Sequence, residues 1–332
     1  MIYRKKVRFI LTLIFLSIVI IEPETAKVAT RDGINLCLNT VLPGILIFLI
    51  IGSMSSDDIL GFSAPRFEAV LGIPKGMCGF FLIGQLCGYP VGAKLLQEVS
   101  NRHAAVKKDA MRMINFCNNA SPAFIIGIIG PIFGNYRIGI LMWIIQIASS
   151  FILAFIMKKQ STAHITNTPG RPRRQLIGDV IKTAAVICGW IILFKIFLSY
   201  LDLLLLNSIP PLSKTLLWGS IEITNGLLRL KETNSQALCF VVSSFFLSFG
   251  GICVILQTRS VAPDLPLREY ILSRLIHSGI SCTLTSVLSW ILFSKTRIIL
   301  ANTVLFAAAT AICCLVLYFN QNNGSIYRKN VV

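Results

Sequence analysis

Apolar segments of membrane-spanning length follow one another along the chain, and short polar loops separate them. A helix of about 20 apolar residues crosses the hydrocarbon core of a bilayer. Composition agrees, since 55% of the residues are hydrophobic and 14% are charged, against about 25% charged in a soluble domain. The sequence therefore predicts an all-α integral membrane protein in a lipid bilayer. After the N-terminus, its segments cover approximately 34–54, 76–96, 112–134, 138–157, 178–206, 213–230, 236–258, 271–294 and 298–319.

Composition and motifs argue against several classes of function. The net charge of +17 is typical of nucleic-acid binding, but the Lys and Arg residues lie beside apolar segments, where they set membrane topology. We therefore expect no nucleic-acid partner. The ten cysteines show no CxxC spacing, which indicates reduced apolar side chains and no metal site. Because no Ser-His-Asp set, phosphate-binding loop or carboxylate pair is present, we expect no enzyme activity, no catalytic residue and no cofactor. The isolated histidines are predicted on loops or at the surface: His103, His164 and His277.

The N-terminal segment carries a basic end before a short apolar run at 9–21. This pattern predicts an uncleaved signal anchor with a cytosolic N-terminus, and a cleaved signal peptide is the alternative. The rest of the chain is predicted to form two halves joined by a basic linker. The predicted units are 1–33, the anchor and an outer loop; 34–157, the first repeat; 158–179, the cytosolic linker; 180–295, the second repeat; and 296–332, a C-terminal helix and tail.

Charge placement decides how segments 76–96 and 213–230 sit in the membrane. Basic loops flank 76–96, with Lys75 before it and Arg102 after it. Positively charged loops stay in the cytosol, so both stay inside only if the segment enters the membrane and returns on the same side. Applied to both segments, this rule predicts about eight transmembrane helices plus two re-entrant hairpins, in an inverted repeat of the transporter type. The same rule assigns Arg274 to a cytosolic loop.

The first hairpin contains the most irregular stretch of the chain, at 84–94, where Gly, Pro, Gln and Lys interrupt an apolar segment. Proline favours the first turn of a helix, so Pro90 is predicted to start a half-helix whose free N–H groups attract anions. Lys94 adds a positive charge one turn later. The alternative is that the glycines allow close packing and Lys94 reaches the cytosolic interface. The candidate binding residues here are Gln85, Gly88, Tyr89, Pro90, Val91, Gly92 and Lys94.

Asparagines follow the first hairpin at helical spacing. Asn115, Asn118, Asn119 and Pro122 are predicted to share one helix face, with Ser121 beside them. Pro122 has no N–H to donate to the carbonyl of Asn118, which leaves that oxygen available. Such a face suits a polar ligand or a cation. The alternative is that the amides hold helices together by hydrogen bonds.

The second half contains an acidic residue inside an apolar segment. An ionisable side chain at membrane depth is costly and marks a candidate functional site, so Glu222 is predicted to carry a coupling proton or to pair with Lys94. The alternative places Glu222 in water at the outer interface. Its neighbours Thr224, Asn225 and Gly226 are candidates with it. A further break is predicted at Ser248, Gly250 and Gly251.

Four of these motifs carry a family resemblance. GYPVGAK at 88–94, FCNNASPAF at 116–124, EITNG at 222–226 and FGG at 249–251 resemble the YlbJ-like family of sporulation membrane proteins. This group lies within the nucleoside-recognition, or Gate, domain membrane proteins. The resemblance runs from about residue 34 to residue 295.

The resemblance implies a membrane protein of endospore-forming bacteria. It implies the outer forespore membrane and the movement of dipicolinic acid out of the mother cell. The wider Gate group is similar to concentrative nucleoside transporters, which have inverted repeats and re-entrant hairpins. We therefore expect a transporter for a small organic anion, with dipicolinate as the first candidate. The alternatives are a nucleoside transporter that uses Gln85, Asn118 and Asn119, or a spore-envelope protein without transport activity. Whether the chain forms a homo-oligomer is left open.

Overall fold

The computed structural model describes residues 2–55, 59–161, 163, 165, 173–205 and 209–293, and this part is all-helical without a β-sheet. Six of its ranges are long and apolar enough to cross a membrane. This confirms the predicted all-α, multi-pass class. The C-terminal helix expected within 298–319 lies outside the described residues. The six ranges are Pro23–Met54, Ala104–Phe133, Tyr136–Ile156, Ile177–Leu204, Gln236–Val261 and Leu267–Leu292.

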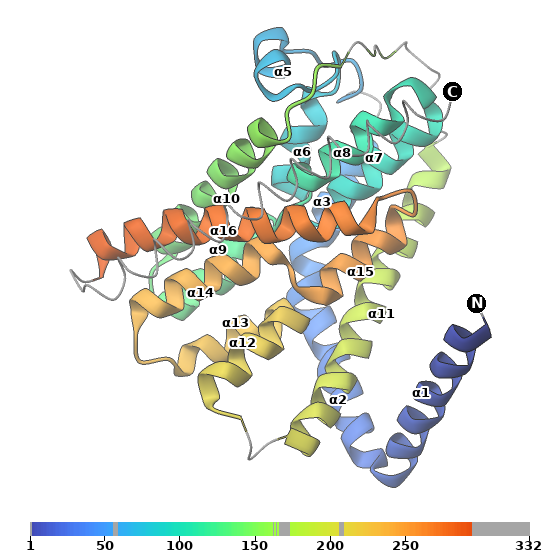
Figure 1. Cartoon of the computed structure of the whole chain (residues 1–332), viewed down its shortest axis with the longest axis vertical. Coiled ribbons are helices and arrows are strands. Elements are labelled where there is room, and N and C mark those ends of the chain that lie inside the picture. The colour runs from blue at the N-terminus through green and yellow to red at the C-terminus, as the bar shows by residue number, and fades with distance from the viewer. Residues whose placement is uncertain are drawn as a thin grey trace.

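The chain begins with helices α1 (Ile2–Ile21) and α2 (Pro23–Leu36), which join end to end. The outer loop expected after the anchor is therefore helical, because Pro23 stands in the first turn of α2 and the helix packs along α11 (Arg173–Leu205). Gly33 permits that packing, since a Cβ added to it would lie 3.1 Å from the Cα of Ile192. In Figure 1, α2 and α11 run side by side while α1 extends away from them.

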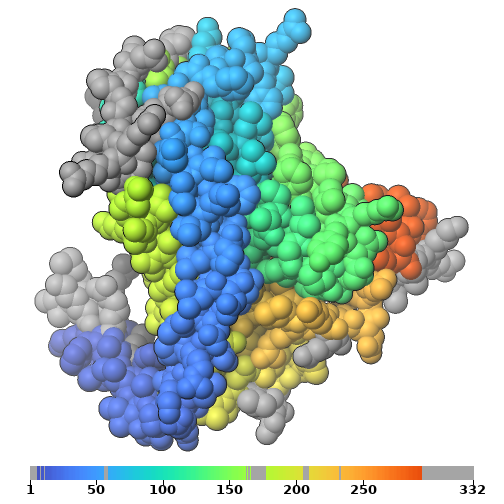
Figure 2. Space-filling view, turned by 180° about the vertical axis from the view of Figure 1, so that it is seen from behind, coloured from blue at the N-terminus to red at the C-terminus, as the bar shows by residue number. Residues whose placement is uncertain are grey.

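A π-helical turn, η1 (Cys37–Val41), separates α2 from α3 (Leu42–Met54). The N–H of Leu42 donates to the carbonyl of Cys37, five residues earlier. Pro43 explains the turn, because a proline within a helix cannot donate the usual backbone hydrogen bond and crowds the preceding turn. From behind, α2 and α3 form one ridge between α11 and α10 (Tyr136–Ile156) (Figure 2).

The two segments predicted as hairpins fold back on themselves. In the first, α6 (Cys78–Cys87) and α7 (Val91–Arg102) are joined by a turn at 88–90. A Cβ added to Gly92 would lie 3.2 Å from the Cα of Gly84, so the two helices touch backbone to backbone. In the second, α12 (Pro211–Ile221) and α13 (Ile223–Arg229) are joined at Glu222, and Gly226 lies against Gly219. The local prediction of broken segments is confirmed.

Each hairpin is followed by a helix that is itself broken. Helices α8 (Lys107–Cys117) and α9 (Pro122–Phe133) are separated by the extended residues 118–121. Helices α14 (Gln236–Phe249) and α15 (Gly251–Val261) are separated at Gly250, whose φ of +82° is left-handed. The predicted continuous face from Asn115 to Pro122 is therefore wrong, because α8 ends at Cys117. The Gly250 break is confirmed.

Long helices close each half: α10 in the first and α16 (Leu267–Leu292) in the second. They pack against each other, and α16 also packs along α14. The short elements between these helices are η2 (Ala104–Val106), η3 (Leu230–Glu232) and α5 (Pro65–Leu71). Helix α11 begins at Arg173, inside the range predicted as the linker, and residues 162, 164 and 166–172 of that range lie outside the described residues.

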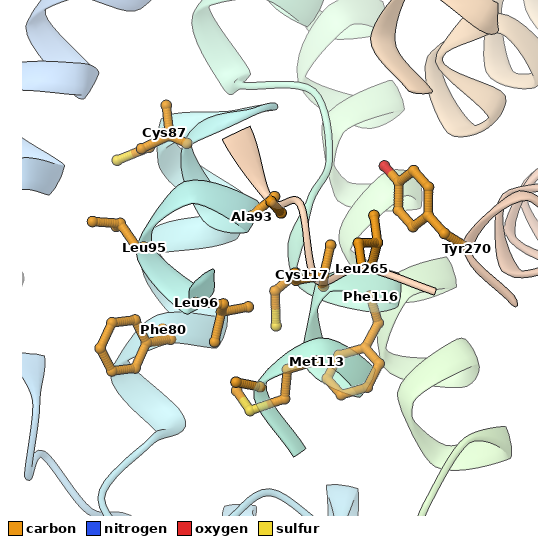
Figure 3. Packing of buried hydrophobic residues seen from close by; sticks show 14 of the residues in the cluster. Phe80, Cys87, Ala93, Leu95, Leu96, Met113, Phe116, Cys117, Leu265 and Tyr270 are labelled. Carbon is orange, nitrogen blue, oxygen red and sulfur yellow. The ribbon is translucent and has the colours of Figure 1, made fainter. Parts of the chain in front are cut away.

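The first hairpin is fixed against α8 by buried apolar side chains. Figure 3 shows Phe80 and Leu96 of the hairpin beside Met113 and Phe116 of α8, with Tyr270 of α16 beyond them. These side chains are almost fully buried. The outward faces are apolar too, as a lipid-facing surface requires, while many serines, amides and several charged groups are buried. The interior of this bundle is therefore unusually polar.

Candidate functional site

The hairpin turns meet the helix breaks. Gly88, in the turn between α6 and α7, has a φ of +80°, and a Cβ there would lie 2.8 Å from the Cβ of Ser121 in the α8–α9 break. In the second half, a Cβ on Gly251 would lie 3.0 Å from the carbonyl oxygen of Ile221, at the end of α12. Each turn thus lies directly against the break of the helix that follows it.

A cavity of about 40 Å³ lies between the two turns, the α8–α9 break and α15. We call it the tip cavity. A water molecule needs roughly 10–15 Å³ by this measure, so the cavity has room for a few waters. Its polar lining comes from the two turns, the α8–α9 break and α15, and its apolar lining from η1, α3, α9, α11, α13 and α15. The lining residues are Val41, Ile45, Gly88, Tyr89, Ser121, Phe124, Ile187, Ile191, Glu222, Ile223, Thr224, Val254 and Gln257.

Glu222 holds the second turn together. Its side chain is 1% exposed and accepts hydrogen bonds from the N–H of Thr224 at 3.1 Å and of Asn225 at 2.8 Å. The side-chain amide of Asn225 donates to it as well, at 2.8 Å, and Lys195 Nζ donates to Asn225 Oδ1 at 3.1 Å. The carboxylate therefore caps α13, where a negative charge is favourable. Glu222 is buried, which excludes the solvated alternative in this structure.

The first turn of α7, which was predicted to bind an anion, does not line the tip cavity. Pro90 precedes the first residue of α7, as expected. However, the N–H of Val91 donates to Gly88 O at 2.9 Å, and Gly92 lies against the carbonyl of Cys117. This first turn therefore packs on α8, and only Gly88 and Tyr89 of this hairpin line the tip cavity.

Lys94 lines a second cavity of about 310 Å³, which we call the vestibule. The side chain is 8% exposed, and its Nζ donates to the carbonyl of Asp179 at 3.3 Å. Lys94 and Glu222 therefore line different cavities and do not form the predicted pair. The vestibule residues are Lys94, Gln97, Glu98, Asn101, Asp179, Lys182, Thr183, Val186, Ser260, Val261 and Pro263.

Asp264 connects the vestibule edge to the first hairpin. Gln97 Nε2 donates to its carboxylate at 3.0 Å, its own N–H donates to Gln97 Oε1 at 3.1 Å, and Lys107 Nζ lies 2.8 Å away. The hydrogen bonds from Lys107 and Gln97 lower the pKa of Asp264 below the ordinary 3.8. A carboxyl with a lowered pKa stabilises the fold above its ordinary pKa and loses that contribution as the pH falls through the lowered value.

We expect Asp264→Asn to lower the melting temperature of the purified protein at neutral pH. The difference from wild type should shrink as the pH falls below 3.8, because protonated Asp264 resembles the amide. Melting curves of both proteins over that pH range measure it. A difference that stays constant down to the lowest pH would contradict the role of the carboxylate charge.

The side-chain amides predicted to bind a ligand form hydrogen bonds with other side chains of the protein. Asn118 Nδ2 donates to Thr258 Oγ1 at 3.0 Å and to Tyr270 OH at 2.8 Å. Asn119 Nδ2 donates to Gln85 Oε1 at 3.0 Å and to Ser150 Oγ at 2.7 Å. These bonds join the α8–α9 break to α6, α10, α15 and α16, as the alternative of interhelical hydrogen bonding expects. Neither these asparagines nor Gln85 lines the tip cavity.

Two buried ionisable residues were not identified as site candidates from the sequence. Arg274 is 2% exposed and His277 0% exposed, although they were assigned to a cytosolic loop and to a loop or surface. Both lie inside α16, which begins at Leu267. His277 Nε2 lies 2.8 Å from Ser149 Oγ. The spacing of Arg274, His277, Ser278 and Ser281, which places them on one helix face, is the signal that could have located them.

Of the predicted site residues, five line the tip cavity: Gly88, Tyr89, Ser121, Glu222 and Thr224. Asn225 and Gly226 follow within α13, Ser248 lies in the last turn of α14, and Gly250 and Gly251 stand at the second break. Pro122 begins α9 with Ser121 as its N-cap. Ligand binding by these residues stays a prediction.

Comparison with known proteins gives one informative relative. No family model matches the chain, and no solved structure matches it. The sporulation integral membrane protein YlbJ of Bacillus subtilis (strain 168) is 25% identical over an alignment of 328 positions, and the match covers 82% of this chain and 79% of the relative. The chain is thus a homologue of sporulation integral membrane protein YlbJ and, like it, a multi-pass integral membrane protein.

Proposed function

We propose that this protein is a transporter that moves a small organic anion across a membrane of the sporulating cell. Dipicolinic acid is the first candidate, moved from the mother cell across the outer forespore membrane towards the forespore. The observation that carries the proposal is the meeting of both hairpin turns and the α8–α9 break at one cavity, with α15 of the second broken helix in its wall. Transporters build their substrate sites from interrupted helices at the interface of two repeats. The proposal assigns binding and movement to the protein, and no chemical step.

The order of elements supports an inverted repeat. Each half runs through a long helical span, a hairpin, a broken helix and a second long helix. In this proposal the hairpins 76–96 and 213–230 enter the bilayer from opposite sides, beside about eight transmembrane helices. The tip cavity then lies between the two aqueous sides.

The size of the tip cavity supports a closed state. Small-molecule sites usually measure about 300–1,000 Å³, and the tip cavity measures about 40 Å³. A planar ring would need the two turns to move apart before it could lie between the apolar walls of Ile187, Ile191 and Val254. In this proposal, that movement exposes the site to the vestibule on one side.

Lysines near the site support an anionic solute. Glu222 lines the tip cavity, and Lys195 reaches the same turn through Asn225. The vestibule is lined by Lys94 and Lys182, together with the acids Glu98 and Asp179. A lysine shielded from bulk water attracts an anion more strongly than an exposed lysine does, because the effective dielectric constant is lower there.

A neutral nucleoside is the second candidate. It is favoured by the hydroxyl and amide groups of Ser121, Thr224 and Gln257, which line the tip cavity beside apolar walls. Such a ligand would depend on these neutral groups and little on Lys94. A spore-envelope protein without transport activity is the remaining candidate.

Uptake into vesicles separates these candidates. We expect purified protein reconstituted in vesicles loaded with terbium to produce dipicolinate-dependent luminescence, because dipicolinate that enters chelates the metal. Radiolabelled nucleosides are measured in parallel. Nucleoside uptake without dipicolinate uptake would favour the second candidate. Uptake of neither, by protein that remains folded, would contradict the proposal.

Lys94→Ala is expected to slow dipicolinate uptake by about tenfold or more, since a lost charge-assisted contact is worth roughly 1.5–3 kcal/mol. Lys108→Ala is the matched control, because Lys108 is exposed on α8 and lines neither cavity. Initial rates of luminescence increase give the comparison. Equal rates for Lys94→Ala and wild type would remove Lys94 from the transport path.

A further inference from the structure

Helix breaks leave backbone carbonyls without helical partners. The last four carbonyls of a helix lack an intrahelical donor and carry the negative end of the helix dipole. At the first break these include the carbonyl of Asn115, and the carbonyl of Asn118 follows in the extended residues, which have no helical hydrogen bonds. At the second break they include the carbonyl of Ser248, near the end of α14. Both breaks therefore present oxygen atoms that suit a cation.

The guanidinium of Arg274 fills these positions. Its Nη1 donates to Asn118 O at 3.0 Å, to Asn119 Oδ1 at 3.1 Å and to Ser248 O at 3.4 Å. Its Nη2 donates to Asn115 O. The acceptors come from α8, from the extended residues after α8 and from α14. One side chain thus joins the breaks of both halves.

The charge of Arg274 is balanced by dipoles. Its hydrogen-bond acceptors in the described part of the chain are three carbonyls and one amide oxygen, with no carboxylate among them. Its guanidinium carbon also lies 5.4 Å from the centre of the Tyr270 ring. A buried charge needs compensation, and oriented carbonyls supply it here as they do for metal ions in transporters.

We infer that Arg274 is a tethered cation that occupies the position a free monovalent ion would take between the two breaks. The planar fork of a guanidinium reaches several oxygens at once, and the covalent tether keeps the site filled. It follows that the fold needs no sodium at this position, and that transport, if the proposed function is correct, does not require sodium either. The sequence predicted that the carbonyl of Asn118 could bind a cation, and in this inference the cation is the guanidinium of Arg274.

The first test uses the wild-type protein. Its melting temperature, and its dipicolinate uptake in vesicles, are measured in sodium, potassium and choline chloride at equal ionic strength. We expect the same melting temperature and the same uptake rate in all three salts. A clear increase of either in sodium would overturn the inference.

The second test removes the tether with Arg274→Ala. Because several buried carbonyls lose their donor, we expect the melting temperature to fall by roughly 5 °C or more. Sodium or dilute guanidinium should recover a substantial part of that loss, and choline, which is too large for the site, should not. Equal melting temperatures of this variant in sodium, guanidinium and choline would also overturn the inference, because a packing role alone predicts no cation dependence.

Two further variants control the comparison. Arg259→Ala removes another guanidinium that donates to a carbonyl, that of Leu265, but Arg259 is exposed, so water can replace it and no recovery by cations is expected. Arg274→Lys keeps the charge with fewer donors, and it should melt below wild type without a sodium response. If Arg274→Ala does not fold, the wild-type salt comparison and the lysine variant still decide. If no solute is transported at all, the proposed function fails while the melting temperatures continue to test Arg274.

Discussion

Replacing Gly226 by alanine is expected to prevent the second hairpin from closing. The added methyl group would collide with the Cα of Gly219 and would lie 2.8 Å from a ring carbon of Phe246. Backbone atoms cannot move aside as a flexible side chain can, so we expect a loss of about 3 kcal/mol or more in the free energy of unfolding. That is a large share of a stability of about 5–15 kcal/mol. The yield of monodisperse protein and its melting temperature measure the effect.

Gly178→Ala is the matched control for this glycine. Gly178 lies in α11, and a Cβ added there meets nothing within 4 Å. Alanine favours a helix over glycine by about 1 kcal/mol, so the control should melt at the same temperature as wild type or higher. If Gly226→Ala melted at the same temperature as the Gly178→Ala control, the two arms of the hairpin would not touch.

Replacing Glu222 by alanine is expected to unravel the start of α13 and abolish solute uptake. The change removes the acceptor of two backbone N–H groups and one amide. Loss of a helix cap costs about 0.5–2 kcal/mol, and each buried donor left unsatisfied costs about 1–3 kcal/mol. Lys195 also loses the nearby negative charge. Melting temperature and the rate of uptake are the two readouts.

Glu222→Asp separates the cap from the transport role. Aspartate is a favoured N-cap, so this variant should melt close to wild type while its carboxylate is withdrawn by one methylene from the tip cavity. Glu24→Ala is the control, because Glu24 stands in the first turn of α2 with its side chain 76% exposed, and little change is expected there. Full uptake by Glu222→Ala would exclude Glu222 from the transport site.

The breaks in the fold could be predicted because they are encoded locally. Pro90 restricts its own φ and Gly250 permits a positive φ wherever they stand, so the hairpin turns and the second helix break were located from the sequence. The Asn118 carbonyl was also identified from the sequence, but it is free because α8 ends at Cys117, and Arg274 donates to it. The basic loops on both sides of 76–96 also predicted that this segment folds back on itself.

The side chains that line each cavity are determined by tertiary packing, so they could not be predicted from local sequence. Lys94 is only four residues beyond Pro90, yet its side chain lies in the vestibule because α7 packs its first turn against α8. Arg274 was assigned to a loop because the charge rule does not identify the first residue of a helix. The polar residues of α2 suggested a loop, but packing along α11 makes them helical.

The π-helical turn η1 has a consequence for comparisons among relatives. It places one extra residue in the helical path, and one residue corresponds to about 100° of rotation around a helix axis. Val41 and Ile45 face the tip cavity with that extra residue in place. A homologue with a single-residue deletion between Cys37 and Val41 would therefore direct a different set of α3 side chains inward, and alignments should treat such a gap as a change of solute specificity.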